Sequence, residues 1–285
     1  MGRKGSEETP LPDNKKTPLR VALGGLGAVG LPVAEWLDSE NEPLLKLVAV
    51  SAGNKERAAE RLAHLNNPPD VVGLEGLADV ADVVVECAPP EKFLDVCAPA
   101  IEAGKILVPL SVTQLLHHMD LIDRARETGA TIVVPTGAIV GLDTVRAAAE
   151  GNLQSVVMRT HKPPAGFQKS VWVREQGMNL MGLNAPKKLY EGSVRDAADK
   201  FPANVNVAVA LSLAGLGPDE TRYEVWADPT ITRNTHWITV ESDIVRVEMN
   251  IAGEPTEENP ATGKIVPLSL IATLRGLVSP MRVGT

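Results

Sequence analysis

The sequence predicts an α/β protein in which a doubly wound parallel sheet is followed by an α+β domain with a mostly antiparallel sheet. Three observations predict this fold. The apolar run 19–24 leads directly into a glycine-rich turn and a helical pattern. Short apolar segments then alternate with helical patterns as far as residue 134, which is typical of a parallel sheet. Beyond residue 141, alternation of apolar and polar residues predicts strands.

The glycine-rich turn reads Gly25-Leu26-Gly27-Ala28-Val29-Gly30 and indicates a dinucleotide-binding βαβ unit, the core of a Rossmann domain. The first glycine permits the turn, the second lets a diphosphate approach the backbone, and the third lets the helix pack on the strand. A second apolar segment, 45–50, closes the unit. We therefore expect Gly25, Gly27, Ala28, Val29 and Gly30 to bind the cofactor.

The remaining elements follow from the same patterns. Further strands are expected over 80–87, 106–109 and 131–134, and helices near 55–65, 91–103 and 113–128. In the second domain we expect strands within 155–161, 223–227 and 236–250, a helix over 204–214, and a final helix in the run 266–278.

Four segments result. Residues 1–17 are polar and form a disordered tail, 18–141 form the Rossmann domain, 142–258 form the α+β domain, and 259–285 end in a helix that packs back on the body. The sequence does not indicate which domain receives this helix.

Composition excludes several classes of protein. A net charge of −8 disfavours nucleic acid and anionic membranes as partners, and no apolar run is long enough to span a membrane. Because the N-terminal residues show no apolar signal region, we expect a cytoplasmic location, where Cys87 and Cys97 would stay reduced. The five histidines lack the spacing of metal ligands, so no metal site is expected.

The choice between NAD and NADP depends on the end of the second strand. NAD-binding units carry an acidic residue there, but this chain has Ser51. Lys55 and Arg57 follow and suit a 2′-phosphate, which makes NADP a serious option. The alternative is that these cations only solvate the start of a helix.

Three other strand ends should face the cofactor, because the carboxyl ends of parallel strands line the binding cleft. They place Ala88, Ser111 and Ala138 at the site. The loop 135–139 (Pro-Thr-Gly-Ala-Ile) is distinctive, since Gly137 and Ala138 leave the backbone clear for a ring.

Several phrases, in this order after the glycine motif, resemble the L-aspartate dehydrogenase family over residues 19–278. They are Pro-Thr-Gly-Ala-Ile at 135–139, Lys-Pro-Pro at 162–164, Phe-Pro-Ala-Asn-Val-Asn-Val-Ala at 201–208, Ala-Asp-Pro at 227–229, Asn-Thr-His at 234–236 and Asn-Pro-Ala-Thr at 259–262. The resemblance implies NAD(P)-dependent oxidation of L-aspartate to iminoaspartate, which hydrolyses to oxaloacetate and ammonia, or the reverse amination. It also implies a role in NAD biosynthesis and a homodimer.

By the same resemblance, Ala138 and Asn206 match cofactor-contacting positions and His236 matches the catalytic histidine. A histidine with a pKa near 6.5 can accept protons from an amine and from water, which both steps require. The alternative for His236 is a hydrogen-bonded strand residue, and His161 is the rival histidine.

A dicarboxylate substrate needs a cation or several donors. We assign Lys162, Asn204, Thr262 and Gly263 to this task, with Arg233 as a further candidate. Lys162 could instead only end a strand, and Asn204 could instead cap the helix that begins nearby.

Two departures from the family pattern leave other functions open. The stretch 165–188 is longer than the usual connection, and Ser51 replaces an acid. The alternatives are a dehydrogenase or reductase of another amino acid, 2-oxo acid or cyclic imine, and a non-catalytic dinucleotide sensor. A DNA-binding regulator fits less well, because a basic winged segment is missing.

Overall fold

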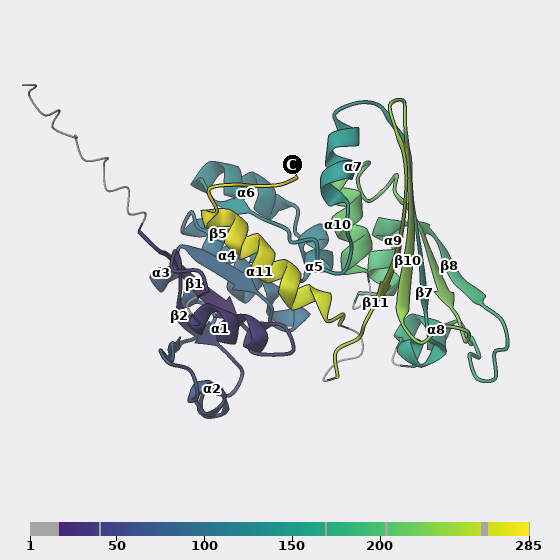
Figure 1. The fold of residues 1–285 in the computed structure, drawn as a ribbon. Helices are drawn as coiled ribbons and strands as arrows, with labels where there is room; N and C mark the ends of the chain where they lie inside the picture. Colours follow the sequence, from purple (N-terminus) through teal and green to yellow (C-terminus); the bar gives the residue numbers. More distant parts are fainter. Residues whose placement is uncertain (1–16, 40, 169, 203–204, 258–261, 285) are drawn as a thin grey trace, which may run out of the picture.

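A computed structural model describes residues 17–39, 41–168, 170–202, 205–257 and 262–284. The chain folds around two sheets that stand side by side, each with its own helices (Figure 1). The predicted disordered tail, 1–17, lies outside the described residues apart from Thr17.

The first sheet is parallel and has the order β3-β2-β1-β4-β5-β6. Its order reverses between β1 and β4, which is the switch point where α/β sheets bind nucleotides. Val21 and Leu23 belong to one apolar cluster and Ala22, between them, to another, so both faces of the sheet are buried. The strands are β1 Leu19–Gly24, β2 Leu45–Ser51, β3 Asp70–Val71, β4 Val83–Glu86, β5 Ile106–Pro109 and β6 Thr131–Ile132.

The elements of this domain follow the predicted alternation, but β3 and a short helix before β4 were not expected, and two expected elements have other bounds. The helix expected over 113–128 is divided, because His118 leaves the helical conformation and stacks on Phe93 with ring centroids 6.0 Å apart. The strand expected from residue 80 begins only at Val83, since a short helix ends at Val80. The helices are α1 Gly30–Asp38, α2 Lys55–Leu62, α3 Leu77–Val80, η1 Pro90–Lys92, α4 Phe93–Glu102, α5 Val112–His117 and α6 Asp120–Thr128.

The second sheet is mostly antiparallel, with the order β11-β10-β7-β9-β8 and one parallel pair, β7 with β9. The expected run 236–250 is a hairpin of two strands, and β8 was not expected. The strands are β7 Leu153–Lys162, β8 Lys187–Ser193, β9 Arg222–Ala227, β10 Asn234–Ser242 and β11 Arg246–Gly253.

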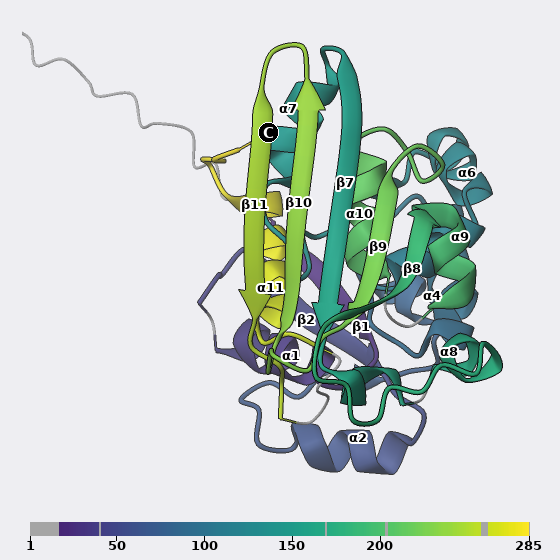
Figure 2. The same cartoon turned by 90° about the vertical axis from the view of Figure 1, so that its right-hand side faces the viewer.

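Helices cover one face of this second sheet and leave the other open (Figure 2). Met158 and Ile238 of the sheet pack in one cluster with Val145, Ala197 and Leu211 of the helices. These helices are α7 Leu142–Ala149, α9 Val194–Lys200 and α10 Asn206–Ala214, and η2 Pro164–Phe167 and α8 Val171–Glu175 lie beyond the end of β7.

The last helix, α11 Ile265–Val278, returns to the first domain and lies beside α1 (Figure 1). Its Leu270 and Leu274 share a core cluster with Val33 and Leu37 of α1. The chain therefore runs through the second domain and back, so two connections join the domains. None of the helices in the described ranges is long and apolar enough to cross a membrane.

Candidate active site

A cavity of about 350 Å³ lies where the carboxyl ends of β4 and β5 meet the second sheet. Both domains contribute to its wall. The lining includes these predicted site residues: Val29, Ala88, Ser111, Ala138, Lys162, Asn206, His236, Thr262 and Gly263.

The glycine loop beside this cavity has the geometry of a diphosphate cradle. Gly25 has a φ of +131°, and a Cβ there would lie 2.3 Å from the carbonyl oxygen of Cys87. A Cβ on Gly30 would lie 2.0 Å from the Gly25 carbonyl oxygen, so the turn and the helix pack too closely for a side chain. A Cβ on Gly27 would meet nothing within 4 Å, which leaves open space for a ligand. The residues present therefore fit a dinucleotide.

The adenosine side of the site holds Ser51 and Lys55, away from the cavity. Ser51 is the buried last residue of β2, and Lys55 is exposed at the first turn of α2. The Asn54 side chain caps that helix by accepting from the Arg57 N–H at 2.7 Å. Arg61, which sequence reasoning missed, donates from Nη1 to the Leu26 carbonyl of the glycine loop at 2.8 Å. The end of β2 thus carries a hydroxyl where NAD-specific units carry an acid.

His236 lies on β10, buried in the cavity wall. Its Nδ1 is 2.9 Å from Oγ1 of Thr160, its partner in register on β7, so Nε2 is the ring nitrogen free for a ligand. Burial first, and the charge of Lys162 second, lower the pKa of His236 to about 3. The expected pKa near 6.5 is therefore wrong for this side chain, because the cavity wall excludes the water that stabilises imidazolium.

Lys162 is the last residue of β7 and is 6% exposed. Burial lowers the pKa of its ammonium to about 8. Among the described residues, the cavity lining contains no Asp or Glu. Arg233, the other candidate cation, forms an ion pair with Glu254 at 2.7 Å and is not part of the lining.

Asn206 starts α10 and joins the two domains. Its Oδ1 accepts hydrogen bonds from the backbone N–H of Thr113 (2.9 Å) and from the Thr113 hydroxyl (2.6 Å). Because the carbonyl oxygen is held in this way, the amide nitrogen is the group that Asn206 can offer to a ligand in the cavity. Asn204, the other predicted residue of this segment, lies outside the described residues.

Ser111 contacts a residue that sequence reasoning missed. Its backbone N–H and its hydroxyl donate to the carboxylate of Glu86, at 2.9 and 3.0 Å. Glu86 ends the otherwise apolar strand β4 and is fully buried. The sequence did contain a signal for this residue, because a glutamate at the end of an apolar strand indicates a buried carboxylate with specific partners.

The other candidates lie away from the cavity. His161 is on the opposite face of the second sheet, where its Nδ1 lies 2.8 Å from Asp228 Oδ2 and its ring stacks on Trp226. The long stretch expected near the site, 165–188, contributes no described residue to the lining. Its Trp172 instead packs against Phe201, with ring centroids 5.0 Å apart.

Comparison with known proteins identifies the family. Residues 143–277 match the family described as "Aspartate dehydrogenase, C-terminal", and residues 25–135 match "Homoserine dehydrogenase, NAD binding domain". An L-aspartate dehydrogenase of Bradyrhizobium diazoefficiens is 47% identical over 94% of both chains. The chain belongs to the aspartate dehydrogenase family. An L-aspartate dehydrogenase of Methanosarcina acetivorans is 33% identical over 94% of this chain and 100% of its own.

Solved structures agree on the fold of this family member. An aspartate dehydrogenase of Thermotoga maritima superposes with a TM-score of 0.69 and 24% identity, over 93% of this chain and 99% of its own. GenD2 from gentamicin A biosynthesis, solved with NAD, has a TM-score of 0.52 and 16% identity. The parallel sheet and the second mixed sheet are therefore shared with known dehydrogenases, and the match of residues 25–135 to an NAD-binding domain family indicates an NAD(P) cofactor.

Proposed function

We propose that this enzyme oxidises L-aspartate with NAD(P)⁺ to iminoaspartate, which water converts to oxaloacetate and ammonia, and that it also runs the reverse amination. The observation that carries the proposal is one cavity that places His236 and Lys162 opposite the cofactor loops of the first sheet. A bound NAD(P)⁺ supplies the acceptor for the hydride that leaves the substrate Cα.

Lys162 is proposed to bind a substrate carboxylate. Its ammonium is charged below a pH of about 8, since burial lowers its pKa to about that value. A carboxylate of a dicarboxylate that enters the cavity would form charge-assisted hydrogen bonds with this buried cation. Thr262 and Gly263 line the same cavity and would add a hydroxyl and a backbone N–H. An isolated β-bridge to Pro255 holds Gly263 in place.

His236 is proposed to move protons at its Nε2. The amine must lose a proton before hydride can leave Cα, and the water that attacks the imine carbon must lose one as ammonia departs. The imidazole is neutral in the free enzyme because its pKa is about 3. Substrate carboxylates bound beside it would raise that pKa and make proton acceptance feasible.

The proposal is tested by initial rates, followed through the absorbance of reduced nicotinamide. Purified enzyme is given oxaloacetate and ammonia with NADH or NADPH, and in parallel a panel of other 2-oxo acids and a cyclic imine. Selective turnover of oxaloacetate supports the proposal, and the ratio of the two coenzymes reports the role of Ser51 and Lys55. Turnover of another substrate, or coenzyme binding without any turnover, would contradict it and favour a different dehydrogenase or a sensor.

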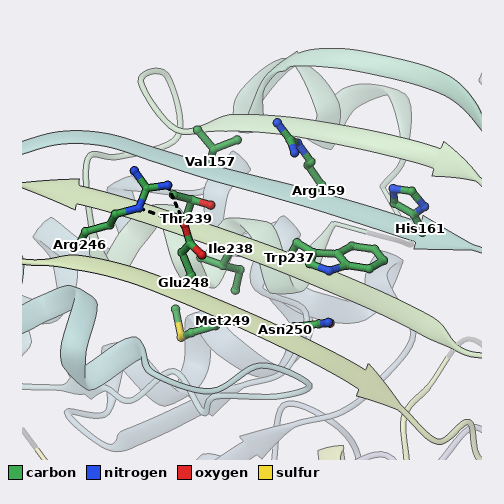
Figure 3. A pocket seen from close by; sticks show the side chains of 10 residues that line it. All are labelled: Val157, Arg159, His161, Trp237, Ile238, Thr239, Arg246, Glu248, Met249 and Asn250. Carbon is green, nitrogen blue, oxygen red and sulfur yellow. Dashed lines mark hydrogen bonds and ion pairs between the residues drawn. The ribbon is translucent and has the colours of Figure 1, made fainter.

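We further propose that the chain forms a homodimer through the open face of the second sheet. A groove of about 680 Å³ crosses this face (Figure 3). It combines Trp237 and His161 with Arg159, Arg246 and Glu248. Aromatic residues and arginine are enriched at protein interfaces, and paired charges of both signs suit a two-fold contact between identical surfaces.

Light scattering coupled to size-exclusion chromatography tests this contact. The wild type is expected at twice the chain mass, and Trp237→Glu, which buries a charge in the contact, is expected at the chain mass. Met281→Glu, at an exposed position on the other domain, is the matched control and should stay dimeric. A monomeric wild type would contradict the proposal.

We also propose a cytoplasmic location, which the two free cysteines, Cys87 and Cys97, support.

A further inference from the structure

Glu86 is a buried carboxylate directly behind the cavity wall. Its Oε2 accepts hydrogen bonds from the backbone N–H groups of Leu110 (3.2 Å) and Ser111 (2.9 Å), and its Oε1 accepts from the Ser111 hydroxyl (3.0 Å). Both partner residues, Leu110 and Ser111, line the cavity, so one layer of hydrogen-bonded atoms separates the carboxylate from it.

The groups that contact this carboxylate favour its ionised form. Burial raises the pKa of Glu86 above its usual value, and the hydrogen bonds from Ser111 and Leu110 oppose this rise because they stabilise the carboxylate. Burying a carboxylate is costly even with such partners. A neutral side chain could also link the ends of β4 and β5, so a link alone does not explain why the residue here is charged.

The carboxylate of Glu86 lies directly behind the cavity wall, because its donors Leu110 and Ser111 line the cavity. In its ionised form Glu86 places a negative charge behind a part of the cavity whose described lining has no carboxylate of its own.

The nicotinamide is the part of the cofactor that changes its charge on reduction. A diphosphate held at the β1 turn would leave the nicotinamide to occupy the cavity at the ends of β4 and β5. The oxidised nicotinamide ring is a cation, whereas the reduced ring is neutral. A fixed negative charge nearby stabilises the first form and not the second.

We propose that Glu86 determines the preference of the site for oxidised over reduced coenzyme through its negative charge. This inference rests on coenzyme binding and not on the identity of the substrate. A single charge in a partly buried site changes such a relative affinity by about tenfold.

The test compares coenzyme affinities of the wild type and Glu86→Gln by isothermal titration calorimetry. The substitution keeps the size and an acceptor oxygen but removes the charge. The ratio of Kd for the oxidised to the reduced form is expected to rise about tenfold, through weaker binding of the oxidised form. Ser111→Ala is the matched control, because it removes one hydrogen bond and keeps the charge, so both affinities should change together.

Two outcomes would overturn the proposal. Equal weakening of both forms by Glu86→Gln would make Glu86 a structural link only, and unchanged affinities would remove its role altogether. If the glutamine variant does not fold, Glu86→Asp replaces it, because the shorter side chain moves the charge away by one methylene. The ratio of the Kd values for oxidised and reduced coenzyme should then rise by a smaller factor. An unchanged ratio would contradict the proposal. Failure of aspartate turnover would contradict the proposed function alone, since this test measures only coenzyme binding.

Discussion

The Thr160 hydroxyl lies 2.9 Å from Nδ1 of His236, across two paired strands in the buried face of the second sheet. This hydroxyl holds the imidazole at Nδ1, and the contact leaves Nε2 for the cavity. The orientation of the catalytic candidate depends on a residue that the sequence did not single out.

Removing this hydroxyl should impair turnover more than binding. Thr160→Val keeps the shape of the side chain but frees the imidazole, and we expect kcat to fall about tenfold or more while the Kd of the coenzyme stays unchanged. Thr160→Ser retains the hydroxyl and should recover most of the loss. Steady-state kinetics with L-aspartate check this, and a valine variant with wild-type kcat would show that the contact is only structural.

The pKa of Lys162 predicts how dicarboxylate binding depends on pH. Its ammonium loses the proton above a pH of about 8, because burial lowers the pKa. The inhibition constant of succinate, a dicarboxylate without an amine of its own, should therefore rise about tenfold per pH unit above that value. Lys162→Arg keeps its charge throughout and should flatten the profile. A flat profile in the wild type would contradict carboxylate binding by Lys162.

The contact between Asn206 and Thr113 predicts a role for a second threonine. Thr113→Val removes the 2.6 Å hydrogen bond to the Asn206 Oδ1, one of the two that hold it, and so positions the amide less firmly. We expect the Kd of the coenzyme to rise about fivefold, the value of one hydrogen bond of this kind. Titration calorimetry measures the change, and Thr113→Ser serves as the control. Equal affinities in the wild type and the valine variant would show that the Thr113 hydroxyl does not position Asn206 for coenzyme binding.

Lys55 gives a prediction about coenzyme choice. Its exposed ammonium at the start of α2 would attract a 2′-phosphate, so Lys55→Ala should raise the KM for NADPH by about threefold to tenfold and leave that for NADH unchanged. Lys46, an exposed lysine within β2, offers a matched control as Lys46→Ala. If the KM values for NADPH and NADH move together, Lys55 only solvates its helix.

Much of the site could be predicted from the sequence, because short motifs fix the local backbone. The glycine motif has the conformations its spacing demands: Gly25 has a positive φ and Gly30 packs too closely for a Cβ. The phrases around Ala138, Asn206 and His236 lie far apart in the chain, yet the structure places them on one cavity. Their individual roles stay predictions.

What the sequence did not reveal depends on tertiary contacts. The role of Glu86 depends on the N–H groups of Leu110 and Ser111, at the end of the neighbouring strand, which donate to its carboxylate. The pKa of His236 follows from burial, which no local pattern encodes. The break at His118 likewise depends on Phe93 of another helix, which packs against it.

The most direct test of the account is the replacement of His236 by alanine. We predict that kcat with L-aspartate falls about 100-fold or more, as expected for loss of a group that transfers protons, while the Kd of the reduced coenzyme stays within about twofold of the wild type. A variant that binds coenzyme normally and turns over L-aspartate at the wild-type rate would contradict the central claim, that His236 moves the protons of this reaction.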